Sequence, residues 1–335
     1  MKLTYEQIKS ITLGADRILE NDGKYVFWRF NEKELDFFSK TALTPRETST
    51  SGIQFEFKTD AKALTLTGYI SLATPMTFYA FDVFVNGKFF TAMKNYTGEE
   101  IGIDRIESKF EIGDFEYTVD LPDGQNTVRI VFPWTLHAEI KDLILEGATF
   151  AEPVKKSKTL LMYGDSITQG YNSENPSKSY AVALAWALDA EAYNKGVGGA
   201  CYFPALSEIK CDVNPDYITV AYGTNDWNQV TQPEFESNVR GFLTNLRTNY
   251  PTVKIIIITP IWRADYENEK PFGDFRDVER IVKNVASEIE NTAVISGWNL
   301  VPHETASFAD TKLHPSNKGF EHYFANLIKE VRKVL

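Results

Sequence analysis

The sequence predicts two domains: an antiparallel β-sandwich or jelly roll over residues 1–150, and a parallel, doubly wound α/β domain over residues 158–335. The first part is built from short alternating runs such as IQFEFKT, ALTLTGYI and NTVRIVFP, with the turn signals NG and PDG between runs. In the second part apolar strands alternate with helical segments, which is typical of a parallel sheet buried on both faces. A chain of 335 residues with 43% hydrophobic content is long enough to form two cores.

The elements follow in a clear order. An amphipathic helix opens the chain, the short strands follow it, and the polar segment FAEPVKKSK with Pro153 predicts a linker. The strands expected in the second part are TLLMYG, EAYN, DYITVAYG, KIIIITP and TAVIS. The helices expected between and after them are SYAVALAWALDA, EFESNVRGFLTNLRTNY, DVERIVKNVASEIE and a closing helix from about Asn317.

Charge and composition exclude several classes of function. The net charge of −11 repels phosphate backbones and anionic lipid surfaces, so neither nucleic acid nor a membrane is an expected partner. No run approaches the roughly 20 apolar residues of a membrane span, and the first residues lack the apolar segment of a signal peptide. We therefore expect a cytoplasmic protein. Cys201 and Cys211 are too few for a disulfide framework and are expected to be reduced, structural thiols.

Four loops carry residues that suggest chemistry. Ser166 follows the first strand of the α/β part, NKGVGGA (194–200) the second, YGTNDW (222–227) the third, and DTKLHP (310–315) lies before the last helix. Because ligands bind at the carboxyl ends of parallel strands, we expect all four loops to open on one edge of the sheet.

These residues form a complete set for acyl transfer, although each alone has an ordinary structural explanation as a helix cap or a turn. Acyl transfer needs a nucleophile, a base, a group that orients the base, and donors for an oxyanion. Ser166, His314 and Asp310 are the candidates for the first three roles. The backbone N–H groups of Ser166 and Gly199 and the side-chain amide of Asn225 are the candidate oxyanion donors.

The four motifs GDSIT, NKGVGG, GTND and HP resemble, in order across residues 160–335, the sequence blocks of the SGNH or GDSL hydrolase family. The resemblance implies a flavodoxin-like three-layer domain and metal-free ester hydrolysis with no cofactor. The preceding sandwich is similar to that of two-domain carbohydrate esterases, which remove acetyl groups from plant cell-wall polysaccharides. An acetylated oligosaccharide, or another small ester, is the expected substrate, and no oligomeric state is predicted.

The motif DTKLH departs from the family pattern. The family places the acid three residues before the histidine, whereas Asp310 lies four residues before His314. Either a one-residue bulge brings the carboxylate to the imidazole, or a backbone carbonyl orients His314 in its place.

Three other functions would each need features that this sequence lacks or would leave its motifs unexplained. A metal-dependent phosphohydrolase could use Asp165, but Ile167 and Thr168 stand where its second carboxylate is needed. A non-catalytic carbohydrate-binding protein would explain the sandwich but not the full set of motifs. A lipase or thioesterase acting on non-sugar esters would need an apolar groove, whereas the loops GYNSENPSKS and RADYENEKPFGD are mostly polar.

Substrate contacts are expected from Trp227, Trp262 and Arg263, which follow the third and fourth strands of the α/β part. Aromatic rings can stack on sugars and a guanidinium can bond hydroxyls. The alternative is that the tryptophans pack beneath the loops. In FPWTLHAE, Trp134 and His137 either face the catalytic cleft or lie in an exposed turn.

Overall fold

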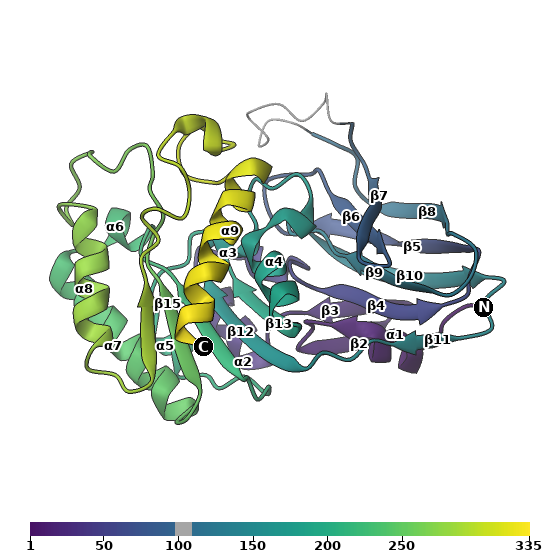
Figure 1. The fold of residues 1–335 in the computed structure, drawn as a ribbon, viewed down its shortest axis with the longest axis horizontal. Helices are drawn as coiled ribbons and strands as arrows, with labels where there is room; N and C mark the ends of the chain where they lie inside the picture. The colour runs from purple at the N-terminus through teal and green to yellow at the C-terminus, as the bar shows by residue number, and fades with distance from the viewer. Residues whose placement is uncertain (98–108) are drawn as a thin grey trace.

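The structure, a computed structural model, describes residues 1–97 and 109–335. Over these residues two antiparallel sheets form the first part of the molecule, and a parallel sheet flanked by helices forms the second (Figure 1). The predicted fold class is confirmed: a sandwich precedes a three-layer α/β domain.

The sandwich pairs two sheets around an aromatic core. One sheet has the order β1-β4-β9-β6-β7, with β11 paired to β4, and the other has the order β2-β3-β10-β5-β8. Phe132 lies at the centre of the core and meets Phe27, Phe55 and Phe81 edge-to-face, with ring centroids 4.8–5.4 Å apart. The strands are β1 (Thr12–Leu13), β2 (Arg17–Asn21), β3 (Lys24–Trp28), β4 (Gln54–Thr59), β5 (Ala63–Leu72), β6 (Ala80–Val85), β7 (Lys88–Lys94), β8 (Asp114–Asp120), β9 (Asn126–Val131), β10 (Leu136–Glu146) and β11 (Ala151–Pro153).

The parallel sheet has the order β13-β12-β14-β15-β16, which is the flavodoxin-like order. Its strands are β12 (Lys158–Gly164), β13 (Ala190–Gly196), β14 (Tyr217–Ala221), β15 (Lys254–Ile258) and β16 (Thr292–Ile295). Successive residues of β12 serve the two faces: Leu160 and Met162 pack with α4 and α9, and Leu161 and Tyr163 pack with α7 and α8. Helices α4 and α9 lie side by side on the face toward the viewer in Figure 1.

The helices of the first part are α1 (Tyr5–Ile11), α2 (Glu32–Ser39) and the 3-10 turn η1 (Arg46–Thr48). Those of the second part are α3 (Ser166–Gln169), η2 (Pro176–Lys178), α4 (Tyr180–Ala187), α5 (Pro204–Ser207), α6 (Asp226–Gln229), α7 (Gln232–Asn249), α8 (Arg276–Ala286), η3 (Thr305–Ser307) and α9 (Asn317–Val334).

The two parts share more structure than a linker. Phe30 and Phe38, from the segment around α2, are fully buried in the core of the α/β part. The segment expected to be a linker begins with a strand, because β11 pairs antiparallel with β4 of the sandwich. The sandwich therefore extends past residue 150. The chain between residues 30 and 51, although it belongs to the first part, packs against the α/β part.

Arg29 is buried where the two parts meet. Its guanidinium donates to the carbonyl oxygens of Ser49 (2.6 Å), Asn194 (2.7 Å) and Gly196 (2.8 Å). Burial lowers the pKa of Arg29 to about 9. A cation removed from water must be fully hydrogen-bonded, so Arg29 fixes the end of β13 to the chain around Ser49.

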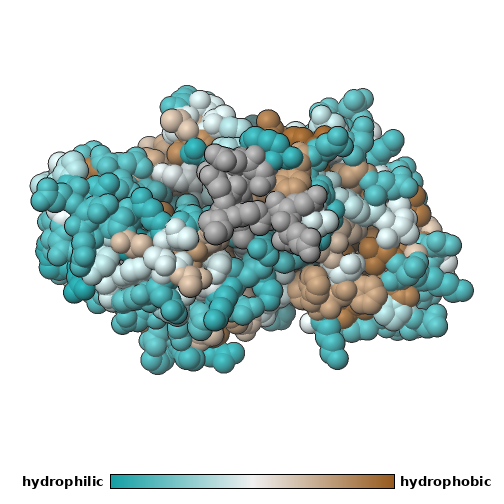
Figure 2. Space-filling model, turned by 90° about the horizontal axis from the view of Figure 1, so that it is seen from above, coloured by the Kyte–Doolittle hydropathy of each residue, from teal (hydrophilic) through white to brown (hydrophobic). Residues whose placement is uncertain are grey.

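Exposed apolar side chains are unevenly distributed. On the face seen in Figure 2, hydrophobic residues gather on the sandwich half, and the α/β half is mostly hydrophilic. Among the described residues, the exposed large apolar side chains are Met1, Leu19, Tyr69, Leu72, Phe89, Phe90, Ile144 and Leu335. None of the helices in the described ranges has the length and apolarity that a membrane crossing would require.

Asp226 ties α6 to the loop after β13. Its Oδ1 accepts a hydrogen bond from the backbone N–H of Tyr202 (3.1 Å), while no described group bonds its buried Oδ2. Burial raises the pKa of Asp226 to about 7, so the fold favours the protonated form.

We expect Arg29→Met to destabilise the protein by about 3 kcal/mol or more, because buried carbonyls lose their donors. The midpoint of urea unfolding measures the loss. Arg17→Met is the matched control, since within residues 1–97 and 109–335 the ion-pair partner of Arg17 is Glu32, whose side chain is 81% exposed. Equal losses from the two substitutions would contradict the role given to Arg29.

Asp226→Asn should change how stability depends on pH. Because the pKa of Asp226 is about 7 in the folded protein and its ordinary value is 3.8, the stability that wild-type Asp226 contributes at low pH is lost as pH rises through about 7. Asparagine stays neutral, so from pH 5 to pH 8 the variant should gain on the order of 2 kcal/mol relative to wild type. Melting curves at pH 5, 6.5 and 8 measure this gain, and a pH-independent difference would exclude it.

Candidate active site

Three of the four expected loops leave neighbouring strands of the parallel sheet. Ser166 follows β12, Gly199 follows β13 and Asn225 follows β14, and β12 lies between the other two strands. Adjacent strands are about 4.8 Å apart, so the three loops meet at the same edge. The fourth loop, before α9, brings His314 to Ser166.

Ser166 is presented at the first position of the short helix α3. The side chain of Asp165 caps this helix by accepting from the N–H of Ile167 (2.9 Å), and Gly170 ends it in the left-handed conformation (φ 104°). The N–H at a helix start has no acceptor within the helix, which leaves the Ser166 N–H available to a ligand. Burial raises the pKa of Asp165 to about 6, and its cap bond shows that Asp165 shapes this turn.

Ser166, His314 and Asp310 form a hydrogen-bonded chain. The Oγ of Ser166 lies 2.8 Å from Nε2 of His314, and Nδ1 of His314 lies 2.7 Å from Oδ2 of Asp310. When Nδ1 donates to the carboxylate, the lone pair of Nε2 faces the serine hydroxyl. This tautomer suits His314 to accept the serine proton.

The longer spacing in DTKLH is absorbed by a closed turn. Thr311 adopts a left-handed conformation (φ 59°), and the N–H of Ala309 bonds the carbonyl of His314 (2.8 Å). Oδ1 of Asp310 accepts from three backbone N–H groups, those of Lys312, Leu313 and His314. Burial alone would raise the pKa of Asp310, but the hydrogen bond and charge of His314, together with backbone N–H groups, lower it to about 2. The carboxylate is therefore ionised at neutral pH.

The candidate oxyanion donors are held by their loops. Gly199 has φ 87°, and a Cβ on it would lie 3.1 Å from Cδ2 of Leu43, so a larger residue would be strained and crowded here. The side-chain amide of Asn225 donates one hydrogen to the carbonyl of Ala200 (3.0 Å). An amide has two N–H bonds, so the second remains available.

Sequence reasoning missed two residues that follow Ser166 closely. The ring of Tyr171 packs on His314, with ring centroids 5.5 Å apart, and on Trp134, at 4.8 Å. Gln169 is fully buried, and its Oε1 accepts from the N–H of Gly198 (2.8 Å). Both lie in the stretch GDSITQGY, so their nearness to the nucleophile was a usable signal.

The exposed-turn interpretation of Trp134 and His137 is wrong. Trp134 is 2% exposed and donates to the carbonyl of Ser173 (2.9 Å), which places it behind Tyr171. His137 is 6% exposed in β10, with its Nδ1 2.6 Å from the carbonyl oxygen of Thr48, and burial lowers its pKa.

Two of the three residues expected to contact the substrate, Trp227 and Arg263, are buried, and the expectation for them is wrong. Trp227 is fully buried and donates to the carbonyl of Gly273 (2.8 Å), so it packs beneath the loop. Arg263 is 3% exposed: it makes two bonds to Asp265 (2.5 and 3.0 Å) and two to Thr224 (3.0 and 3.1 Å). Because Arg263 is buried and four of its five N–H donors are engaged in these bonds, it is not placed to bond sugar hydroxyls.

Arg263 instead connects the loop of Asn225 to that of His314. Asp265, its carboxylate partner, also pairs with Lys312 (2.9 Å), and the N–H of Ala264 bonds the carbonyl of Lys312 (2.9 Å). Trp262, the third expected contact, is half-buried; it stacks on His303 with ring centroids 5.5 Å apart and touches Phe308, at the start of the loop that carries Asp310 and His314.

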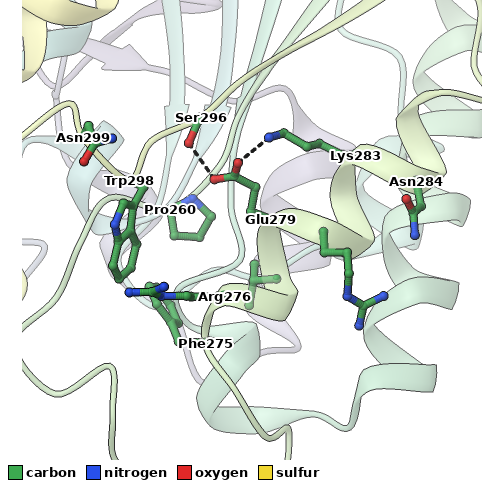
Figure 3. A pocket seen from close by; sticks show the side chains of 11 residues that line it. Pro260, Phe275, Arg276, Glu279, Lys283, Asn284, Ser296, Trp298 and Asn299 are labelled. Atoms are coloured by element: carbon green, nitrogen blue, oxygen red, sulfur yellow. Dashed lines mark hydrogen bonds and ion pairs between the residues drawn. The ribbon is translucent and has the colours of Figure 1, made fainter.

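A pocket of about 420 Å³ lies elsewhere, between α8 and the loop after β16 (Figure 3). Ser296 donates to Glu279, whose carboxylate also pairs with Lys283. Burial alone would raise the pKa of Glu279, but these hydrogen bonds outweigh burial and lower it. Glu279 is therefore an ionised carboxylate that accepts hydrogen bonds from Ser296 and Lys283. No histidine is among the described residues that line this pocket, so Ser296 has no imidazole partner there.

Comparison with known proteins agrees with this geometry. Residues 162–322 match the GDSL-like Lipase/Acylhydrolase family. No curated protein sequence matches the chain.

Several solved structures share the fold across both domains. A salicylyl-acyltransferase from a tetracycline biosynthetic pathway is 20% identical, with a TM-score of 0.78 over 96% of this chain and 94% of that chain. A GDSL-like lipase structure from Bacteroides ovatus is 14% identical, with a TM-score of 0.75 over 100% and 97%. A family two carbohydrate esterase from Clostridium thermocellum, in complex with cellohexaose, is 16% identical, with a TM-score of 0.66 over 95% and 98%. Residues 162–322, which make up most of the α/β part, are thus similar to the GDSL-like lipase/acylhydrolase family, and the two-domain fold is shared with these solved structures.

Proposed function

We propose that the protein is a serine esterase that hydrolyses small acyl esters of carbohydrates, with acetyl as the acyl group. The observation that carries this proposal is the hydrogen-bonded chain from Ser166 Oγ through His314 to Asp310 at the carboxyl edge of the parallel sheet. That constellation serves nucleophilic acyl transfer in unrelated folds, and its residues here are those of the family motifs.

The geometry supports a two-step reaction. Ser166 Oγ attacks the ester carbonyl while its proton passes to Nε2 of His314. The N–H groups of Ser166 and Gly199 and the amide of Asn225 stabilise the oxyanion. When the tetrahedral intermediate collapses, the bond between the acyl carbon and the sugar oxygen breaks. The sugar oxygen takes the proton from His314, and the acyl group stays on Ser166. Water, deprotonated by His314, then attacks the acyl-serine and releases the carboxylate.

A carbohydrate substrate is favoured over a lipid by the distribution of apolar surface. Apart from the terminal Leu335, the exposed large apolar side chains among the described residues all belong to the first 146 residues, on the sandwich side. An extended acyl chain needs a continuous apolar groove beside the nucleophile. The fold shared with carbohydrate esterases agrees with this choice, and Trp262 is the remaining candidate to contact the sugar.

Replacing Ser166 by Ala should lower kcat by about 10³-fold or more and leave the melting temperature close to that of wild type. His314→Ala should be equally damaging, because nucleophile and base act as a unit. A serine-directed phosphonate should add one label per wild-type chain, at Ser166, as read by peptide mass spectrometry. Full activity of Ser166→Ala, or a label on another residue, would refute the nucleophile assignment.

The substrate class is tested with p-nitrophenyl esters of two to twelve carbons, followed by acetylated xylo- and manno-oligosaccharides. We expect kcat/KM to be highest for the acetate ester and to fall as the acyl chain lengthens. We also expect the enzyme to release acetate from the acetylated oligosaccharides. If kcat/KM instead climbs with chain length and the sugars are inert, a lipase or thioesterase takes the place of the carbohydrate esterase. Ser166→Ala serves as the blank for both panels.

A further inference from the structure

The peptide unit between Gly198 and Gly199 carries the oxyanion donor. The carbonyl oxygen of Gly198 and the N–H of Gly199 belong to one planar trans unit and point in opposite directions. Whatever holds that carbonyl oxygen therefore sets the direction of the Gly199 N–H. In this structure Nη1 of Arg46 donates to it, at 3.1 Å.

Arg46 belongs to η1, in the sandwich part of the chain, 152 residues from its partner. Its guanidinium lies close over the oxyanion loop, since a Cβ added to Gly199 would meet Nη1 at 3.3 Å. Its positive charge reaches the wall beside His314, where it opposes the rise that burial causes in the pKa of Tyr171. Among the described residues, Arg46 forms no ion pair with a carboxylate.

The backbone of Arg46 is itself anchored. Its carbonyl accepts from the buried Arg29 (3.3 Å) and from Gln169 (3.4 Å). Gln169 also donates to Ser49 Oγ (2.9 Å), while its Oε1 holds the N–H of Gly198. Both polar ends of Gly198 are therefore held by groups fixed to the sandwich.

We propose that Arg46 is a positioning residue of the oxyanion hole, supplied by the N-terminal domain. Its guanidinium orients the Gly198–Gly199 peptide, and its charge polarises that peptide so that the Gly199 N–H becomes a stronger donor, because hydrogen bonds in series reinforce one another. The inference rests on the proposed function, in which that N–H stabilises the oxyanion. It means that a residue outside the region matching the family controls the rate of the chemical step.

The test compares Arg46→Ala and Arg46→Lys with wild type on p-nitrophenyl acetate. Because the donor is misoriented but not removed, kcat should fall about 10- to 100-fold in Arg46→Ala. KM should stay within about twofold, since ground-state binding is not affected. Arg46→Lys keeps the charge and a hydrogen-bond donor group and should retain more activity than Arg46→Ala. Lys40→Ala is the matched control, because Lys40 is an exposed cation nearby in the chain whose ion-pair partner, in the part of the chain that the structure describes, is Asp36.

Chemical rescue separates positioning from a general loss of structure. Free guanidinium, at concentrations that leave the wild-type melting curve unchanged, should restore part of kcat in Arg46→Ala and none in Ser166→Ala. A melting temperature of Arg46→Lys close to wild type keeps the comparison valid if Arg46→Ala folds poorly.

Three outcomes would overturn the inference: an unchanged kcat in both variants, a raised KM with kcat unchanged, or a loss that guanidinium does not restore. A raised KM would mean that Arg46 binds the substrate directly. Failure of the proposed function is distinguishable, because wild type would then hydrolyse no ester and the phosphonate would not label Ser166.

Discussion

The site depends on one buried cation. Arg29 has no water to solvate it, so its guanidinium must be satisfied by carbonyl oxygens, and those available come from both domains. Meeting this requirement fixes the end of β13, from which the loop of Gly199 leaves, relative to the chain around Ser49 before any substrate arrives. The base of that loop and the sandwich are thus held together by a single desolvated charge and the partners it requires.

The sandwich accordingly helps to hold the residues of the proposed active site in place. Ser51 Oγ donates to the carbonyl of Gln169 (2.6 Å), at the end of the nucleophile helix. Gln169 in turn accepts from the oxyanion loop. Lys195, in β13, is fully buried and bonds Glu34 of α2 at 2.8 Å. Buried polar groups of this kind tolerate little displacement, because each lost partner leaves an unsatisfied atom in the interior.

The sequence predicted the fold class and the candidate triad because both follow local rules. Strand periodicity marks a parallel sheet, and chemistry at strand ends follows from its topology. The contact between Asp310 and His314 depends on a left-handed residue that spacing alone does not specify. Trp227 was misassigned because exposure is a tertiary property, and the pairing of Arg46 with Gly198 joins segments 152 residues apart that share no motif.

The short connection between the domains limits how the molecule can move. Only residues 154–157 separate β11 from β12, and they are held at both ends: the N–H of Val154 bonds Glu56 (3.2 Å) and that of Ser157 bonds Asp189 (3.1 Å). Lys156 between them pairs with Glu56 at 2.7 Å and is almost fully buried. Hinge closure needs a few residues free to change their backbone angles, and this segment offers none. Substrate entry must therefore rely on loops and side chains around a preorganised centre, and turnover carries no cost for reassembling the two domains in each cycle.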